Sequence, residues 1–290
     1  MWDECPEKHH RRYRELLEPK NAKPNWALLY GSAIHNAIDQ WNKHEVVTLQ
    51  IELPEGIILD GEDEVLLEYW QGVLEVQMER YMIYYAEDFE NHEVIMNEEV
   101  LRTEFMGITL EGKIDRVWRM GKKIVQVDTK TVSSLDKDKY DGWHFKFQFL
   151  FYTWLLAKAK GIVPNEVWVD AIKKPAQRRK KEESTPALIQ RIRQEMIQNP
   201  QDYFMRIPLL MHKGTLERFE KEILVPKINR IRYLTNDPAP AIVDVLTRNK
   251  NTESCHNYGS TCPYLPLCLH GDKAERFRYT EREHKHVELL

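Results

Sequence analysis

The sequence lacks the marks of several protein classes. No apolar run approaches the roughly 18 residues that a membrane-spanning helix requires, and the first twenty residues contain no apolar stretch like that of a secretory signal. We therefore expect a soluble, cytoplasmic protein without membrane contacts. An excess of positive charge is also missing, because 42 basic and 46 acidic residues give a net charge of -4. This balance argues against coating DNA by bulk electrostatics and leaves room only for a local basic groove.

Cysteine is scarce, and its four positions are Cys5, Cys255, Cys262 and Cys268. The last three form a C-x6-C-x5-C run that is rich in turn-forming residues, and no C-x2-C pair is present. Disulfides are rare in intracellular proteins, so we expect these thiols either to bind a metal or to be buried. The missing C-x2-C pair weakens a zinc site. Thiolates spread over longer intervals in loops also suit an iron-sulfur cluster.

The spacing of apolar residues predicts a series of helices and strands. The expected helices are 24–44, 62–86, 143–160, 185–198 and 213–235. The expected strands are 94–105, 108–118, 123–131 and 166–174, with a further extended piece at 203–211. The first three strands form an antiparallel meander, and the helix that follows them is the crossover of a βαβ arrangement. The prediction is a single α/β domain over residues 1–290.

Two of these strands carry aspartates in unusual places. Asp128 and Lys130 point to the same side of their strand, because strand side chains alternate. A three- or four-residue turn at 120–123 places Asp115 opposite Val127 or Asp128, and a two-residue turn shifts it by one position. Carboxylates this close repel each other unless a cation lies between them. We expect a divalent metal there, with Lys130 facing an anionic substrate or an attacking water; a solvated salt-bridge cluster is the alternative.

Two helices carry polar residues that suit the same site. His35 follows Gly31 by one helical turn, so the missing side chain at Gly31 lets a backbone or ligand approach the imidazole. Gln148 and Tyr152 lie on one face of an otherwise apolar helix and need hydrogen-bond partners where they are buried. Ordinary packing and interior hydrogen bonds account for each of these residues taken alone.

The four patterns together resemble the RecB-like branch of the PD-(D/E)XK nuclease superfamily. They are G-x-x-x-H at 31–35, G-x-I-D-R at 112–116, D-x-K at 128–130 and Q-x-x-x-Y at 148–152. The resemblance implies a restriction-endonuclease-like core, in which a mixed β-sheet is flanked by helices. Asp128 stands where many relatives have glutamate, a variation that the family name itself allows.

The resemblance also implies roles for individual residues. It makes Mg²⁺ or Mn²⁺ the catalytic ion, with ligands from His35, Asp115, Asp128 and the Thr129 carbonyl. It makes Lys130 a catalytic residue that positions and activates the attacking water. Gln148 and Tyr152 then support the site and the nucleic acid, and they complete the predicted catalytic set of Asp115, Asp128, Lys130, Gln148 and Tyr152.

The cysteine arrangement resembles that of the iron-sulfur nucleases of the same branch, the AddB-type and the CRISPR-associated four-cysteine nucleases. One cysteine precedes the nuclease core and three follow it. The resemblance implies that Cys5, Cys255, Cys262 and Cys268 hold a 4Fe-4S cluster, with Zn²⁺ as the alternative. Segments 1–20 and 250–275 then form a subregion that joins the two ends of the chain. The six residues between Cys255 and Cys262 depart from the two residues found there in many relatives. Of the four cysteines, Cys255 therefore fits the pattern of those relatives least well.

The expected function is that of a metal-dependent DNA nuclease. We expect an exonuclease that acts on DNA ends or single strands in recombination, repair or phage DNA processing, in the cytoplasm of a bacterial or phage-infected cell. A non-catalytic module that binds DNA ends or single strands is the alternative. Candidate groove residues are His9, His10, Arg11, Arg12, Arg14, Lys173, Lys174 and the run 178–181. The aromatics Trp143, Phe145 and Phe147 are candidates for base stacking, although most aromatics at helical spacing belong to a core.

Overall fold

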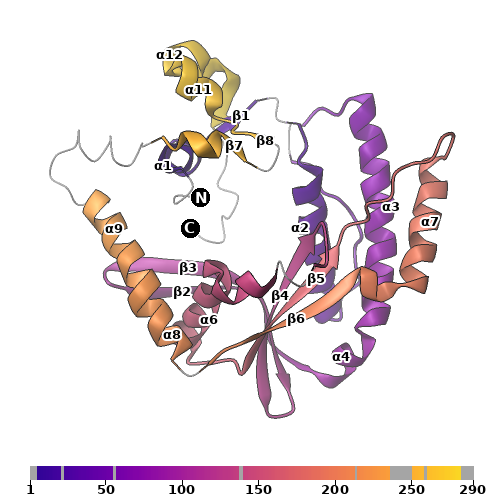
Figure 1. Ribbon diagram of the computed structural model, residues 1–290, viewed down its shortest axis with the longest axis horizontal. Coiled ribbons are helices and arrows are strands. Elements are labelled where there is room, and N and C mark those ends of the chain that lie inside the picture. Colours follow the sequence, from indigo (N-terminus) through magenta and orange to yellow (C-terminus); the bar gives the residue numbers. More distant parts are fainter. Residues whose placement is uncertain are drawn as a thin grey trace. The chain divides into compact units, whose positions relative to one another are not determined.

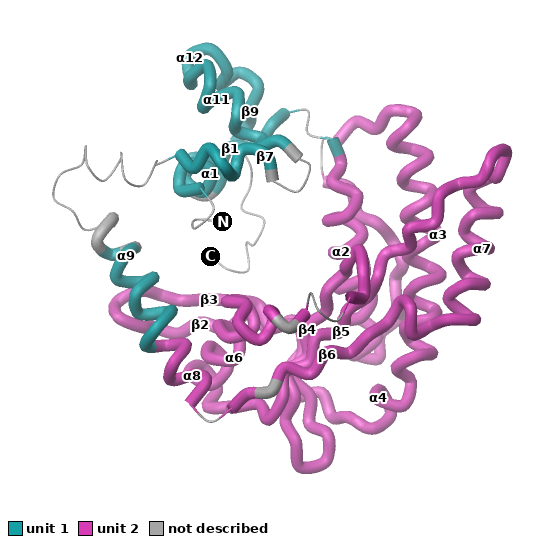
Figure 2. The backbone as a smooth tube through the Cα atoms, viewed as in Figure 1, with its two compact units in different colours: residues 1–23, 221–290 teal, residues 24–220 magenta. Residues whose placement is uncertain are grey.

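The structure is a computed structural model that describes residues 5–20, 23–54, 57–136, 140–212, 214–235, 250–257 and 260–281. The chain divides into two compact units, drawn in separate colours in Figure 2. One unit comprises residues 24–220, and the other joins residues 1–23 to residues 221–290. None of the described helices combines the length and apolar character that a bilayer crossing needs.

The unit of residues 24–220 contains the helices and the main sheet. Its helices are α2 (Trp26–Asn42), α3 (Gly61–Tyr84), α4 (Ala86–Asn91), α6 (Phe147–Lys160), α7 (Thr185–Gln198) and α8 (Thr215–Arg218), with 3-10 turns η2 (Asp141–Phe145) and η3 (Pro200–Asp202). Its strands are β2 (Glu93–Phe105), β3 (Ile108–Met120), β4 (Lys123–Val132), β5 (Glu166–Lys173) and β6 (Phe204–Leu210).

Local signals in the sequence set where the long helices begin. The Asp60 carboxylate accepts the backbone N–H groups of residues 62 and 63, and Asp63 reciprocates, which makes a capping box at the start of α3. Asn25 and Ser184 are simple N-caps of α2 and α7, whose side chains accept the backbone N–H groups of residues 28 and 187. Gly161 ends α6 with φ of 69°, a left-handed conformation that glycine adopts without strain.

The five strands form one mixed sheet in the order β2-β3-β4-β5-β6. Strands β4 and β5 are parallel and are joined through α6, whereas the other neighbours are antiparallel. Helices α2, α3 and α7 lie together on one side of the sheet in Figure 1, and they enclose a core that includes Ile172 and Phe204. On β5, Val167 and Val169 point the opposite way and pack against Phe149 of α6. The predicted mixed sheet flanked by helices is confirmed.

Three details differ from the sequence-based expectation. The helix expected at 143–160 starts at Phe147, because Lys146 is extended and separates it from η2. The helix expected at 213–235 is three consecutive pieces, α8, the π-helical η4 (Phe219–Leu224) and α9 (Val225–Thr235). The extended piece expected at 203–211 is β6, an edge strand of the main sheet.

The unit built from the two chain ends consists of short elements. Its first part holds α1 (Pro6–His9), the π-helical η1 (His10–Arg14) and β1 (Leu17–Pro19). Its last part holds α9, η5 (Thr252–Cys255), β7 (His256–Asn257), β8 (Ser260–Thr261), α11 (Leu265–His270), α12 (Asp272–Glu275), η6 (Arg276–Arg278) and β9 (Tyr279–Glu281). Strand β1 pairs antiparallel with β9, so the first and last parts share one small sheet.

A small core holds these two parts together. Leu17, Leu267 and Tyr279 pack around the buried Tyr264, whose hydroxyl donates to the Leu17 carbonyl oxygen at 2.7 Å. The buried Arg11 guanidinium donates to both Asp272 carboxylate oxygens at 2.6 Å. A side chain that is buried and paired in this way is not available to nucleic acid, so the expectation that Arg11 lines a binding groove is wrong.

Candidate functional site

The β3–β4 hairpin brings the two predicted aspartates together. Met120 pairs with Lys123 and Arg116 pairs with Val127, so one further step of the register places Asp115 opposite Asp128. Position 128 is one of the two expected from the sequence, but the turn has two residues, 121 and 122, for which a shift by one position was expected. Asp115 also turns toward β4, where its Oδ2 accepts the backbone N–H of Thr129 at 2.8 Å. The Asp115 carboxylate is therefore fixed beside the strand that carries Asp128 and Lys130.

Asp128 is the buried acid of the site, with only 1 % of its surface exposed. Lys130 Nζ lies 2.6 Å from Asp128 Oδ2, whereas Oδ1 has no hydrogen-bond partner among the described residues. Burial and the neighbouring Asp115 raise the pKa of Asp128 to about 6. Burial alone would lower the pKa of Lys130, but Asp128 and Asp115 raise it overall. The pair thus combines a firmly protonated amine with a carboxylate that has an unused oxygen.

His35 approaches this pair of strands from α2. Its Nδ1 lies 3.4 Å from Asp115 Oδ2 and 3.9 Å from Glu98 Oε1. One ligand atom from each of these three residues falls within 4.8 Å of the others. Burial would lower the pKa of His35, but Glu98 and Asp115 outweigh it, so the pKa is raised. A cation at this position would satisfy all three groups.

Gly31 allows α2 to approach β4, whereas the sequence led us to expect that it lets a backbone or a ligand approach the His35 imidazole. A Cβ atom placed on Gly31 would lie 3.2 Å from Thr131 Oγ1 of β4, closer than an ordinary van der Waals contact. The neighbour that comes close is therefore the side chain of Thr131. Because Gly31 lies one turn before His35 on α2, this approach helps to bring the imidazole to Asp115.

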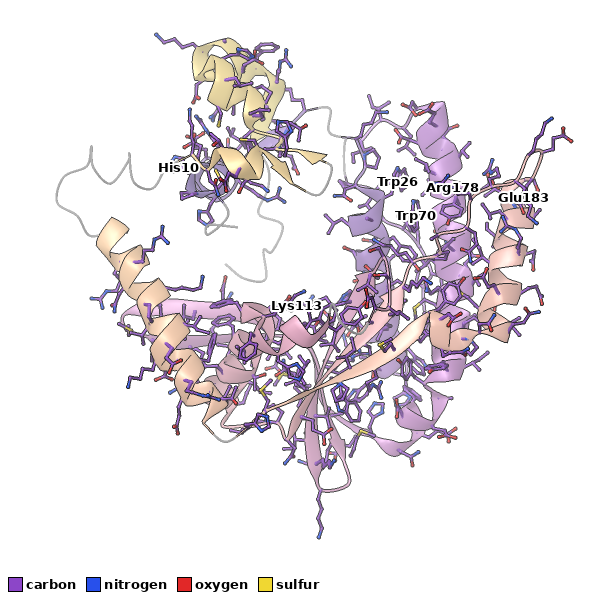
Figure 3. The ribbon with its side chains drawn as sticks, viewed as in Figure 1. His10, Trp26, Trp70, Lys113, Arg178 and Glu183 are labelled. Carbon is purple, nitrogen blue, oxygen red and sulfur yellow. The ribbon has the colours of Figure 1, made fainter. Side chains whose placement is uncertain are left out.

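Glu98 belongs to the site although sequence reasoning missed it. The pairs Asn97–Arg116 and Glu99–Ile114 place Glu98 opposite Asp115, and its φ of 48° is in the left-handed region. Lys113 Nζ lies 2.9 Å from Glu98 Oε2, and Figure 3 labels this lysine.

The left-handed backbone at Glu98 explains why the sequence did not reveal it. Strand alternation assumes an extended backbone at every residue, which a positive φ breaks. The one available signal was the adjacent pair of acids, Glu98 and Glu99, within a strand. Burial would raise the pKa of Glu98, but its contacts with His35 and Lys113 lower it.

Gln148 and Tyr152 lie one turn apart on α6 and form a linked pair, whereas the sequence left the partner of each residue open. Their side chains are hydrogen-bonded, and burial together with the charge of Asp128 raises the pKa of Tyr152. Gly112 of β3 makes room for this tyrosine, because a Cβ there would lie 2.9 Å from Tyr152 Cε1. The Tyr152 hydroxyl is thereby held within electrostatic reach of Asp128.

A buried ionic network supports the strands from the other side of the sheet. Arg116 donates to Thr129 Oγ1 at 2.6 Å and to Tyr81 Oη at 3.3 Å. Its guanidinium also lies 3.4 Å from Asp170 Oδ2. Asp170 in turn accepts two hydrogen bonds from Arg206, at 2.7 and 3.0 Å. Each member bonds a neighbouring strand or helix, so the network fixes the backbone from which the acidic residues of the site project.

The side chains present fit a divalent metal. The unpartnered Asp128 oxygen, the Asp115 carboxylate, the Glu98 carboxylate and the His35 imidazole are oxygen and nitrogen donors that Mg²⁺ or Mn²⁺ accepts. Thr129 lies between Asp128 and Lys130, with its N–H bound to Asp115. The assignment of individual ligands, including the Thr129 carbonyl, remains a prediction.

The four cysteines meet in the unit built from the chain ends. They line one cavity of about 120 Å³, together with Lys8, Lys250 and several residues of the last part of the chain. None of the four forms a disulfide. Burial raises the pKa of the Cys262 and Cys268 thiols. Four thiols on one cavity are the donor set that a tetrahedral zinc or an iron-sulfur cluster requires, although no three of them come within 4.8 Å of one another.

Comparisons with known proteins place these residues in a family. A sequence model of the PD-(D/E)XK nuclease superfamily matches residues 2–268. A search of curated proteins finds no match.

Several solved structures resemble the fold at 12 % sequence identity. A protein from Eubacterium rectale named as an exonuclease has a TM-score of 0.40, with 86 % of this chain and 81 % of that chain covered. A phage-related exonuclease from Haemophilus somnus has a TM-score of 0.37, with 71 % and 82 % covered. The protein SSO0001 has a TM-score of 0.29, with 80 % and 90 % covered. At these TM-scores, nothing about the activity of this chain follows from the likeness.

Proposed function

Because the chain belongs to the PD-(D/E)XK nuclease superfamily, we propose that it is a Mg²⁺- or Mn²⁺-dependent deoxyribonuclease. We propose further that it is an exonuclease of the RecB-like branch, which acts on DNA ends or on single-stranded DNA. One observation carries the proposal: the buried Asp128 has an oxygen without a partner, and Asp115 and Lys130 lie beside it. Lys130 pairs with the other oxygen, but a buried carboxylate oxygen without a partner is still costly, and a bound cation removes that cost.

The residues of the site have separable roles in this proposal. His35, Asp115, Asp128 and the Thr129 carbonyl would hold the metal, with Glu98 as a further donor. The metal would supply a Lewis acid that stabilises negative charge on the scissile phosphate. Lys130 keeps its proton, because two carboxylates raise its pKa. Its ammonium group can therefore orient the attacking water or bind a phosphate oxygen, while Gln148 and Tyr152 bind the DNA backbone.

Cleavage assays with matched variants test the nuclease proposal. Labelled single- and double-stranded DNA is incubated with Mg²⁺ or Mn²⁺ and either wild-type protein, Asp128→Asn or Lys130→Ala. We expect each variant to lose about 100-fold or more of the cleavage rate and to keep its DNA binding. The matched control is Lys123→Ala, which removes an exposed lysine of the same strand that pairs with Glu166. It is expected to cleave at the wild-type rate.

The outcome also separates the enzyme from its alternative. If the wild type binds DNA but cleaves none in any divalent metal, the protein is a non-catalytic module for DNA ends or single strands. If the cleavage products are released only from strand ends, the exonuclease assignment stands. A circular substrate that is cut as fast as a linear one would overturn it.

We propose that Cys5, Cys255, Cys262 and Cys268 bind a 4Fe-4S cluster, with Zn²⁺ as the competing occupant. The cavity that the four cysteines share supports a common ligand. Their order, with one cysteine before the nuclease core and three after it, resembles that of iron-sulfur nucleases and supports a 4Fe-4S cluster over zinc. In this proposal residues 1–290 form one nuclease domain, with the cluster subregion at 1–20 and 250–275. Protein purified anaerobically should contain iron and acid-labile sulfide and absorb near 400 nm. A colourless protein with stoichiometric zinc would overturn the cluster and leave the zinc alternative.

The biological setting follows from the proposed activity. A DNA exonuclease of this kind would act in recombination, repair or phage DNA processing, in the cytoplasm of a bacterial or phage-infected cell. Its partner would be DNA, as an end or a single strand.

A further inference from the structure

Phe145 is a large apolar side chain that is left open beside the proposed active site. It ends η2, directly before α6, and 82 % of its surface is exposed. The two other aromatic residues that the sequence analysis named as candidates for base stacking already pack against other rings. Trp143 is buried and packs in a tilted contact on Phe149, and the ring of Phe147 stacks on Phe151. Phe145 therefore differs from its neighbours in having a free ring face.

A chain of contacts places this segment next to the catalytic lysine. Lys130 Nζ lies 5.8 Å from the centre of the Phe149 ring, and Phe149 and Trp143 have ring centres 5.7 Å apart. Lys146 Nζ lies 4.4 Å above the Trp143 ring. Burial and the charge of Lys130 lower the pKa of Lys146, so the two ammonium groups lie close enough to repel each other. Lys130 is paired with Asp128, so the ammonium group next to Phe145 that is left for a ligand is that of Lys146.

The backbone under Phe145 is anchored. Trp143 and Tyr140 are buried in a core with β5 and β6, and the Lys146 backbone N–H donates to the Trp143 carbonyl oxygen at 3.1 Å. The Tyr140 hydroxyl donates to the Ser134 carbonyl oxygen. A ring presented by a fixed backbone loses little conformational freedom when a ligand stacks on it.

We propose that Phe145 is a base-stacking residue, whose ring stacks on an unpaired base of the DNA strand bound at the Asp115–Asp128 site, while Lys146 binds a neighbouring phosphate. This inference rests on the proposed nuclease function and assigns its substrate as a strand with unpaired bases. A single exposed apolar side chain is common on protein surfaces. The adjoining positive charge selects a polyanion with flat apolar faces, and single-stranded DNA has both properties.

The first test measures binding without cleavage. The Asp128→Asn protein is titrated against a fluorescently labelled twelve-nucleotide single strand in Mg²⁺, and Kd is read from anisotropy. Adding Phe145→Ala is expected to weaken binding about 10-fold, within the range that alanine substitution of stacking residues gives. Phe145→Trp is expected to bind as tightly as the parent. The control Ile83→Ala removes an exposed apolar side chain from α3 and is expected to leave Kd unchanged.

The second test locates the base. A set of twelve oligonucleotides carries one abasic site each, moved one position at a time. If Phe145 stacks on one base, a single abasic position weakens binding to the parent about as much as Phe145→Ala does. The Phe145→Ala protein then binds this abasic oligonucleotide no more weakly than either change alone allows, because both changes remove the same contact. The proposal is overturned if the abasic site and Phe145→Ala weaken binding additively at every position. It is also overturned if the Phe145→Ala protein has the same Kd as the parent.

These outcomes separate the stacking proposal from the nuclease proposal. If the wild type cleaves DNA while Phe145→Ala leaves Kd unchanged, only the stacking proposal fails, and the ring is free for another partner such as a protein. If the wild type cleaves nothing but the abasic pattern depends on Phe145, only the nuclease proposal fails. If the parent binds no oligonucleotide, the stacking proposal is overturned whatever the cleavage assay shows.

Discussion

At the scale of single residues, two glycines control how closely the helices approach the strands of the site. Gly31 faces Thr131 Oγ1, and Gly112 faces the Tyr152 ring. In both places an added methyl group meets a side chain that is already packed. These glycines are needed for the space they leave, since neither has a positive φ.

Gly112→Ala is predicted to cost about 1–3 kcal/mol of unfolding free energy, which is typical of overpacking. The added Cβ would lie 2.9 Å from Tyr152 Cε1 and 3.2 Å from Leu155 Cδ2, so the tyrosine ring must shift. Urea unfolding measures the stability. The matched control is Gly61→Ala, where no atom lies within 4 Å of the added Cβ. Equal stability of the two variants would contradict the packing explanation.

A second residue-scale prediction concerns the pKa of Glu183 in the loop before α7, labelled with Arg178 in Figure 3. Hydrogen bonds from Arg191 and from the Lys180 backbone lower the pKa of this partly buried carboxyl to about 2. Its contribution to stability is thus present above its ordinary pKa and is lost as the pH falls toward 2. Carboxyl NMR titration should give a midpoint near 2. In Arg191→Ala the midpoint should return toward the ordinary value for glutamate, and an unchanged midpoint would refute this cause.

The sequence predicted the side of a regular strand on which a residue lies better than it predicted irregular backbone or distant partners. Strand alternation correctly put Asp128 and Lys130 on one side of β4, because β4 is regular. It missed Glu98, whose left-handed backbone has no marker in the sequence. The prediction for Arg11 was wrong, because a run of charged residues does not show which of them will be buried in a long-range ion pair. Arg11 pairs with Asp272, which is 261 residues further along the chain.

At the scale of elements, strand β4 carries the proposed site on one side and a buried ionic network on the other. Asp128 and Lys130 face the proposed site, and Thr129 between them faces the buried network of Arg116 and Asp170. The sequence indicated the helices and strands well, because their apolar periods are long. It did not reveal the break at Lys146, since aromatic residues recur at every second position across it, from Trp143 of η2 to Phe151 of α6.

Arg116→Met is predicted to destabilise the protein by about 3–5 kcal/mol, because it removes one partner of a buried ionic network. It also leaves Thr129 Oγ1 without the 2.6 Å hydrogen bond from Arg116. Arg119→Met is the control on the same strand, where the pair with Glu93 is half exposed, and it should cost less than about 1 kcal/mol. Chemical denaturation of both variants measures the difference. A small effect of Arg116→Met would mean that the network is not structural.

At the scale of the whole molecule, each compact unit has its own hydrophobic core. The unit of residues 24–220 encloses a large one, whereas the unit of the chain ends has a small core and the four cysteines. Small units often need a metal or a crosslink to be stable. The cysteine order led us to expect that a metal cluster joins the two ends of the chain, and this cluster stays a prediction. The sequence did not indicate the pairing of β1 with β9, because strands of three residues are too short to give a periodic signal.

Calorimetry of the metal-loaded protein is predicted to show two unfolding transitions, one for each core. Cys262→Ser should lower the transition of the chain-end unit by about 10 °C or more, because it removes a ligand of the proposed metal site. The other transition should stay in place. As a control, a chelator added to Cys262→Ser should cause no further shift of the lower transition. If Cys262→Ser shifts both transitions by the same amount, or if the protein shows a single transition, the two units do not unfold separately.

The alternation along β4 has an evolutionary consequence. Inserting or deleting one residue between the hairpin turn and Asp128 would turn this carboxylate toward the Arg116 network and expose Thr129 in its place. Such a change would lose the metal ligands and the buried support at once. Length variation among natural homologues should therefore be absent from this stretch and should appear in pairs of residues if it appears at all.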